Sequence, residues 1–166
     1  MRIINFLWHF STGGIGKCFL TYDQLGNISN DLQIKSVCII LDDNSCDYKP
    51  LSEQGIEIIH IKKRNDFTWL KKLERIVKIE QPNAFFCHGF NGPIMIYLFK
   101  LLYNYKIPMI CTCHGVNLDK TKLGNKIIER IWMLIYRKKC CKKIICVEKF
   151  TTQDLYNTHI EKETII

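Results

Sequence analysis

The sequence lacks any long uninterrupted apolar segment. A bilayer-spanning helix needs roughly 20 apolar residues, but the longest candidate, residues 127–136, is broken by an acidic and a basic side chain. The apolar start of the chain, residues 1–10, is interrupted by Asn5 and His9, and no small-residue cleavage site follows it. We therefore expect neither a transmembrane helix nor a secretory signal, and we expect a cytoplasmic protein.

The sequence also lacks a Cys-x-x-Cys pair, although it contains nine cysteines. The odd number, and the position of several cysteines inside apolar strand-like runs, favour reduced and buried thiols over a disulfide framework. Cys111, Cys113 and His114 are close in sequence, but without zinc-type spacing we expect no metal site. No Ser/His/Asp or Cys/His set indicates a covalent nucleophile.

The length and composition of the chain are typical of one soluble globular domain. The chain has 166 residues, of which 47% are hydrophobic and 24% charged, a balance typical of a folded protein with a real core. We find no internal repeat, low-complexity segment or linker. The formal net charge of +8 indicates an anionic partner, which could be nucleic acid, a nucleotide or an acidic membrane surface.

Strand-like and helix-like segments alternate along the chain. We expect strands over residues 2–10, 33–43, 55–61, 83–89, 107–115 and 142–148, and another beginning at 163. We expect helices over residues 18–29, 66–82 with Asp66 as N-cap, 93–105, 122–140 and 151–158. This alternation predicts an α/β fold, a Rossmann-like three-layer sandwich with a mainly parallel sheet of six to seven strands.

A glycine-rich turn, "STGGIGKC", follows the first strand. A dinucleotide fingerprint fails there because Phe19 occupies the third glycine position, and a Walker A loop fails at Ser11 and Cys18. Consecutive glycines before a helix N-terminus can still hold a phosphate or diphosphate at Gly13 and Gly14. A turn that simply needs positive φ remains the alternative.

Three strands end in a comparable way, at residues 9–14, at His88-Gly89 and at His114-Gly115. In parallel sheets, ligands bind beyond the carboxyl ends of the strands. We therefore expect Gly13, His88 and His114 to lie at one rim of the sheet.

The order of these pieces resembles the N-terminal domain of family 4 glycosyltransferases, which have the GT-B fold. The resemblance rests on "RIINFLWHFSTGGIGK", "NAFFCHGF", "PMICTCHGVN" and "KKIICVEKFTTQDL" in that order. It covers nearly the whole chain, and Glu148, where the family usually has serine or threonine, is a departure. The implied fold is one half of a GT-B enzyme, with residues 1–166 as the acceptor-side domain and the donor-binding C-terminal domain absent.

The resemblance also implies site residues. It places His114 against the transferred sugar as the catalytic position, whereas a hydrogen-bonded structural histidine is the alternative for both His114 and His88. The implied donor-diphosphate contacts are Gly13 and Gly14, and the implied acceptor or sugar contacts are His88, Gly115 and Asn117.

The implied reaction is transfer of a sugar from a nucleotide-sugar to a sugar or lipid-linked acceptor hydroxyl, in surface polysaccharide or glycolipid synthesis. Neither a metal nor another cofactor is implied, and we expect the chain to be inactive alone. One alternative is a non-catalytic subunit of a split glycosyltransferase that acts with a donor-domain partner chain. Another is half of a nucleotide-dependent oxidoreductase, which the broken glycine fingerprint disfavours.

Two basic clusters, residues 62–64 and 137–143, supply much of the positive charge. The second lies next to an apolar helix bearing Trp132 and Tyr136, a combination that peripheral membrane proteins use. A solvated face is the alternative. Because no nucleic-acid recognition motif accompanies the charge, we do not expect a nucleic-acid partner. The expected location is cytoplasmic, with a peripheral site at the inner face of the membrane left open.

Overall fold

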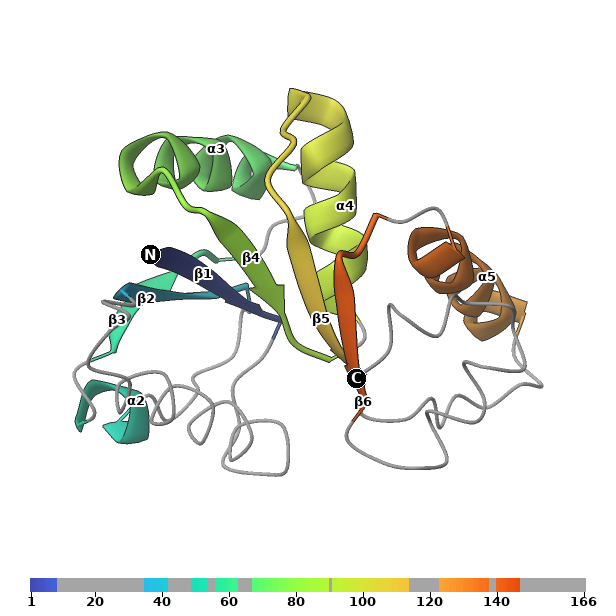
Figure 1. Cartoon of the computed structure of the whole chain (residues 1–166), viewed down its shortest axis with the longest axis horizontal. Coiled ribbons are helices and arrows are strands. Elements are labelled where there is room, and N and C mark those ends of the chain that lie inside the picture. The colour runs from blue at the N-terminus through green and yellow to red at the C-terminus, as the bar shows by residue number, and fades with distance from the viewer. Residues whose placement is uncertain are drawn as a thin grey trace.

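The computed structural model of the chain describes residues 1–8, 35–41, 49–53, 56–62, 67–89, 91–113, 123–137 and 140–146. Six strands in these ranges form one sheet in the order β3-β2-β1-β4-β5-β6 (Figure 1), and every neighbouring pair is parallel. The strands are β1 (Arg2–Leu7), β2 (Lys35–Ile40), β3 (Glu57–His60), β4 (Ala84–Cys87), β5 (Met109–Cys113) and β6 (Lys143–Cys146). This is the strand order of a doubly wound Rossmann sheet, so the predicted fold class is confirmed.

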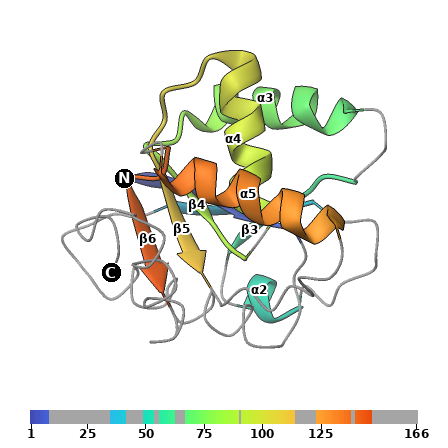
Figure 2. The same cartoon turned by 90° about the vertical axis from the view of Figure 1, so that its right-hand side faces the viewer.

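Helices cover both faces of the sheet. Helices α3 (Thr68–Glu80), α4 (Asn91–Tyr103) and α5 (Leu123–Arg137) lie on one face, and the short α2 (Lys49–Glu53) lies on the other (Figure 2). The three-layer arrangement is therefore as predicted, whereas α2 was not expected from the sequence. The predicted helices at 18–29 and 151–158 and the strand from 163 lie outside the described residues.

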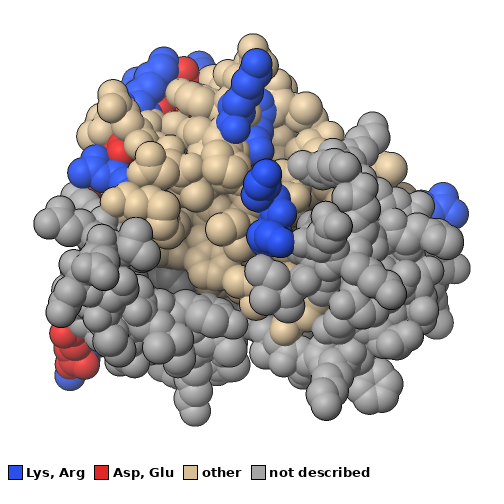
Figure 3. Space-filling view, in the orientation of Figure 1, with Lys and Arg blue, Asp and Glu red and all other residues tan. Residues whose placement is uncertain are grey.

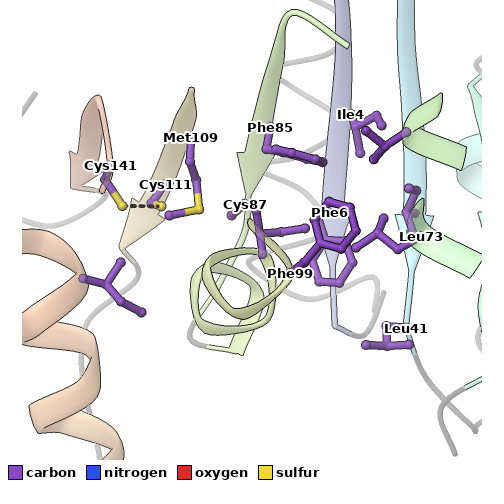
Figure 4. Packing of buried hydrophobic residues seen from close by; sticks show 14 of the residues in the cluster. Ile4, Phe6, Leu41, Leu73, Phe85, Cys87, Phe99, Met109, Cys111 and Cys141 are labelled. Carbon is purple, nitrogen blue, oxygen red and sulfur yellow. Dashed lines mark hydrogen bonds between the residues drawn. The ribbon is translucent and has the colours of Figure 1, made fainter. Parts of the chain in front are cut away.

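The main hydrophobic core lies under α3, α4 and α5. Alternate strand residues point to one face of a sheet, and Ile4, Phe6 and Phe85 are fully buried on this one. Phe99 of α4 packs against Phe85 edge to face, with ring centroids 6.2 Å apart (Figure 4). Burying each such side chain contributes roughly 1.5–3 kcal/mol, so this layer fixes the sheet against the helices.

Helix α3 has the amphipathic pattern that the sequence predicts, with Leu73 and Val77 among its buried residues. Its N-cap is Phe67, at φ 52° and without a side-chain cap hydrogen bond. The prediction of Asp66 as N-cap is therefore wrong. The helix ends at Gln81, whose left-handed backbone lets its N–H donate to the carbonyl of Val77.

The end of α3 is tied to the start of β1. The backbone N–H of Arg2 donates to Oδ1 of Asn83 at 2.8 Å, and the N–H of Asn83 donates to the carbonyl of Arg2 at 2.8 Å. The Arg2 guanidinium lies 3.2 Å from a carboxylate oxygen of Glu80. These contacts define the amino edge of the sheet, opposite the edge where the strands end.

Candidate functional site at the carboxyl edge of the sheet

The strand order changes direction between β1 and β4. From β1 the sheet extends through β2 to β3 on one side, and through β4 and β5 to β6 on the other. Ligands of such sheets bind outside the carboxyl ends of the strands at this switch point. Because β4 ends at Cys87, His88 follows it directly at this position, next to the end of β1.

His88 is held from both neighbouring strands. Its backbone N–H donates to the carbonyl of Phe6 on β1 at 3.1 Å. Its ring Nδ1 lies 3.4 Å from the hydroxyl of Thr112 on β5, and its ring centroid lies 4.4 Å from that of Phe86. The residue is 2% exposed. The imidazole therefore has a defined orientation, and its predicted contact with acceptor or sugar stays a prediction.

Buried polar side chains gather on one face of the sheet near this point. Asn5, His88 and Thr112 are all buried, and the alternation of strand residues places them on the face opposite the main core. Cys87 pairs with Cys111 in the register, so one further step sets His88 beside Thr112. Burying polar groups is costly unless they are hydrogen-bonded. Their concentration beside the switch point therefore indicates a site rather than simple core packing.

The turn after His88 requires glycine and brings α4 close to the sheet. Gly89 has φ 70°, a left-handed conformation that glycine adopts without steric cost. In the first turn of α4, a Cβ on Gly92 would lie 3.4 Å from the carbonyl oxygen of Phe6 and 3.6 Å from the Cβ of Cys87. The N-terminus of α4, whose first amide groups have no acceptor within the helix, therefore lies at the same edge as His88.

The other predicted site residues lie outside the described residues, and their roles stay predictions. They are Gly13, Gly14, His114, Gly115 and Asn117. Strand β5 ends at Cys113, immediately before His114, so this segment leaves the sheet at the same edge as His88. The sequence predicts that Gly13, His88 and His114 lie at one rim of the sheet. Of these three residues, only His88 lies within the described ranges.

Two residues of this polar cluster were not predicted from the sequence. Asn5 is a polar residue inside an apolar strand, and Thr112 is a hydroxyl residue between two cysteines. A polar residue is unusual in a buried strand, and the sequence shows both residues within apolar segments. Only the strand register brings Thr112 next to His88, so the pairing could not be found from spacing.

Two buried cysteines, one in β5 and one just before β6, lie close to each other. The Sγ atoms of Cys111 and Cys141 lie 3.1 Å apart (Figure 4). Burial raises the pKa of the Cys111 thiol, and the hydrogen bond to Cys111, together with burial, raises the pKa of Cys141. Protonated thiols are poor nucleophiles and poor metal ligands. Within the described ranges no cysteine forms a disulfide, and no group of three potential ligands could hold a metal ion.

The parallel sheet and its polar switch point define a Rossmann-like α/β domain. The profile of glycosyltransferase family 4 matches residues 49–166, and the chain belongs to this family. The resemblance predicted from the sequence motifs is thereby confirmed. No curated protein matches the chain by sequence.

Solved glycosyltransferases share the fold. Anabaena HepE in complex with UDP superimposes with a TM-score of 0.74 at 10% identity, covering 100% of this chain and 43% of HepE. The lipopolysaccharide outer core galactosyltransferase WaaB, in its apo form, gives a TM-score of 0.70 at 10% identity, covering 100% of this chain and 44% of WaaB. At this identity the likeness shows the fold, and the chain spans under half the length of these proteins.

Proposed function

We propose that this protein transfers a sugar from a nucleotide-sugar to an acceptor hydroxyl, and that the chain supplies the acceptor-side half of the active site. Membership of glycosyltransferase family 4 supports the reaction class. The similar HepE structures, in complex with UDP and with UDP-glucose, support a nucleotide-sugar donor. WaaB is a lipopolysaccharide outer core galactosyltransferase, which supports an acceptor in a surface polysaccharide or glycolipid.

The observation that carries this proposal is the polar edge between β1 and β4. A helix N-terminus, a left-handed glycine and a buried histidine meet there. In the proposed arrangement His114 contacts the transferred sugar, and the backbone of Gly13 and Gly14 approaches the diphosphate. His88, Gly115 and Asn117 face the acceptor or the sugar, and no metal takes part.

Chemical-shift mapping tests the location of this site. In ¹⁵N-labelled protein titrated with UDP-glucose to millimolar concentration, the amide signals of His88 and Gly89 should shift. The amide signals of Arg2 and Asn83, at the amino edge of the same sheet, serve as the internal control and should stay in place. Shifts confined to the amino edge would overturn the proposed site.

A parallel titration with NAD separates this proposal from the oxidoreductase alternative. The proposal expects UDP-glucose to shift the carboxyl-edge amides and NAD to leave them unchanged at equal concentration. Tight NAD binding at the same edge would instead favour a nucleotide-dependent oxidoreductase. Copurification of a separate donor-domain chain from the native cells would identify the protein as one subunit of a split glycosyltransferase.

We also propose that the chain lies against an anionic membrane surface through α5. The sequence-based expectation named Trp132 and Tyr136 for this contact, but both are buried in the core, so that assignment is wrong. Among the described side chains of α5, those of Ile127, Ile131 and Leu134 are apolar and 50%, 37% and 53% exposed. Their spacing of four and three residues puts them on one helix face, here called the α5 stripe. No helix within the described ranges has the length and apolarity to cross a bilayer.

Positive charge accompanies the α5 stripe. Arg130 is exposed within the same helix, and Lys142 is exposed just before β6. Figure 3 shows further Lys and Arg side chains in a column over α4 and the approach to β6. An apolar stripe beside basic side chains is the combination that binds anionic lipid headgroups in the plane of the interface. Charge complementarity therefore supports an anionic bilayer as the proposed partner of this face.

Cosedimentation with liposomes tests the membrane contact. The chain should sediment with vesicles containing an anionic phospholipid at low salt and be released at high salt, because salt screens the attraction. Leu134→Ser should weaken sedimentation, whereas Ile79→Ser, a change at an exposed apolar residue of α3, should not. Equal sedimentation with neutral and anionic vesicles, or equal effects of the two substitutions, would contradict the proposal.

A further inference from the structure

Thr112 and His88 form a polar pair across two neighbouring strands. Their strands β5 and β4 pair in parallel, with Cys111 opposite Cys87, so the next residues along each strand are Thr112 and His88. The Thr112 side chain is fully buried and its hydroxyl lies 3.4 Å from Nδ1 of His88. Thr112 therefore belongs to the group of buried polar side chains on the face of the sheet opposite the main core.

Three contacts of His88 act on different parts of the residue. The carbonyl of Phe6 fixes its backbone, and the tilted ring of Phe86, at an interplanar angle of 54°, restricts the plane of the imidazole. Neither contact distinguishes the two ring nitrogens by hydrogen bonding. The Thr112 hydroxyl meets Nδ1, and a hydroxyl can donate to an unprotonated nitrogen or accept from a protonated one. In either role the hydroxyl favours one protonation state of Nδ1, so a Thr112 hydroxyl held in one orientation favours one tautomer of His88.

We propose that Thr112 is a positioning residue for His88, holding the imidazole in one tautomer and one orientation at the switch point between β1 and β4. The inference rests on the proposed function for its catalytic meaning, because His88 is expected to contact acceptor or sugar there. What it says of the structure concerns only which ring nitrogen of His88 carries the proton and how the ring is oriented. It can therefore be tested without any sugar transfer.

The direct test is long-range ¹H–¹⁵N correlation of the histidine rings in the 166-residue chain at a pH where His88 is neutral. The signals of His88 are assigned by their loss in His88→Gln. Wild-type His88 should show two widely separated nitrogen shifts, one for a protonated and one for an unprotonated nitrogen. Averaged shifts in the wild type, which report two exchanging tautomers, would overturn the proposal before any Thr112 variant is made.

Two substitutions at Thr112 give a matched comparison. Thr112→Val keeps the shape and removes the hydroxyl, so the His88 nitrogen shifts should move toward each other. Thr112→Ser keeps the hydroxyl and should preserve the wild-type separation. The exposed His60 at the end of β3 is the internal control and should not respond. Unchanged His88 shifts in a folded Thr112→Val protein, or a change confined to His114, would refute the inference.

A second readout connects the pair to activity when a donor domain is supplied. Thr112→Val should lower the rate of sugar transfer about tenfold, the equivalent of one hydrogen bond, and Thr112→Ser should restore most of it. Thr68→Val, at the exposed start of α3, should leave the rate unchanged. If the wild-type protein transfers no sugar, the proposed function fails while the tautomer result stands. If transfer occurs but Thr112→Val matches the wild type, the positioning role fails.

Discussion

The Sγ atoms of Cys111 and Cys141 lie 3.1 Å apart, one inside β5 and the other just before β6. The buried ring of Tyr136 from α5 belongs to the same hydrophobic cluster as these two cysteines. Burial raises the pKa of the Tyr136 hydroxyl as well as that of the Cys111 thiol. The fold therefore keeps three ionisable groups neutral between α5 and the last two strands.

We predict that Cys111 and Cys141 resist alkylation in the native protein. Both are buried with raised pKa values, so neither offers the thiolate that iodoacetamide attacks. The half-buried Cys140 and Cys146 should react first. Mass spectrometry of timed digests measures the order, and Cys111 and Cys141 should become labelled only as denaturant unfolds the chain. Fast native labelling of Cys111 would contradict the packing described for β5.

Tyr136→Phe should stabilise the protein by about 1 kcal/mol at neutral pH, because a buried hydroxyl without a partner carries an uncompensated desolvation cost. The Tyr136 hydroxyl is buried and has no hydrogen-bond partner in the described part of the chain. Tyr97→Phe is the matched control, since the Tyr97 hydroxyl is hydrogen-bonded to Cys140, and should not stabilise. Urea unfolding of the three proteins gives the comparison. A lower midpoint for Tyr136→Phe would show that its hydroxyl contributes to stability.

Stability should fall at alkaline pH. The ordinary pKa values are 9.0 for Cys111 and 10.0 for Tyr136, and both are raised in the folded state. The unfolded chain therefore loses these protons first, so the stabilisation is complete below about pH 9 and is lost as the pH rises further. Each group contributes a slope of up to roughly 1.4 kcal/mol per pH unit. Chemical denaturation between pH 8 and about 11 measures it, and Tyr136→Phe should flatten the part above pH 10.

Gly89→Ala should destabilise the protein by about 1 kcal/mol or more, because an alanine side chain is strained at the φ of 70° that this turn adopts. Gly124→Ala is the control. That glycine lies in α5 with nothing within 4 Å of an added Cβ, so the substitution should stabilise by about 0.5–1 kcal/mol through helix propensity. Thermal unfolding of both variants tests the pair. Equal effects of the same sign would argue against the left-handed turn after His88.

The 166-residue chain by itself should bind nucleotide-sugars no tighter than about millimolar. A few backbone hydrogen bonds, each contributing roughly 1 kcal/mol, leave a weak complex after the entropic cost of association. Isothermal calorimetry with UDP-glucose should therefore show no strong heat signal, and sugar transfer should appear only when a donor domain is added. Robust transfer by this chain alone would show that its complement has been assigned wrongly.

Much of the fold could be predicted from local patterns. The apolar run before the glycine turn predicts β1, and the spacing of apolar residues by three and four in residues 66–82 predicts α3. Both predictions agree with the observed bounds within a few residues. The short helix α2 was missed because its five residues carry no periodic signal. Phe67 rather than Asp66 caps α3, since the conformation of a chain entering a helix depends on contacts beyond the local sequence.

The sequence alone determined that a parallel α/β sheet forms and that His88 follows a strand, because periodicity and strand ends are local properties. Only the tertiary structure decided that Thr112 lies beside His88, that Cys141 meets Cys111, and that α5 exposes Ile131 while burying Trp132. These pairings depend on strand register and on how each helix is rotated against the sheet. Both are set by packing between segments that are distant in the chain.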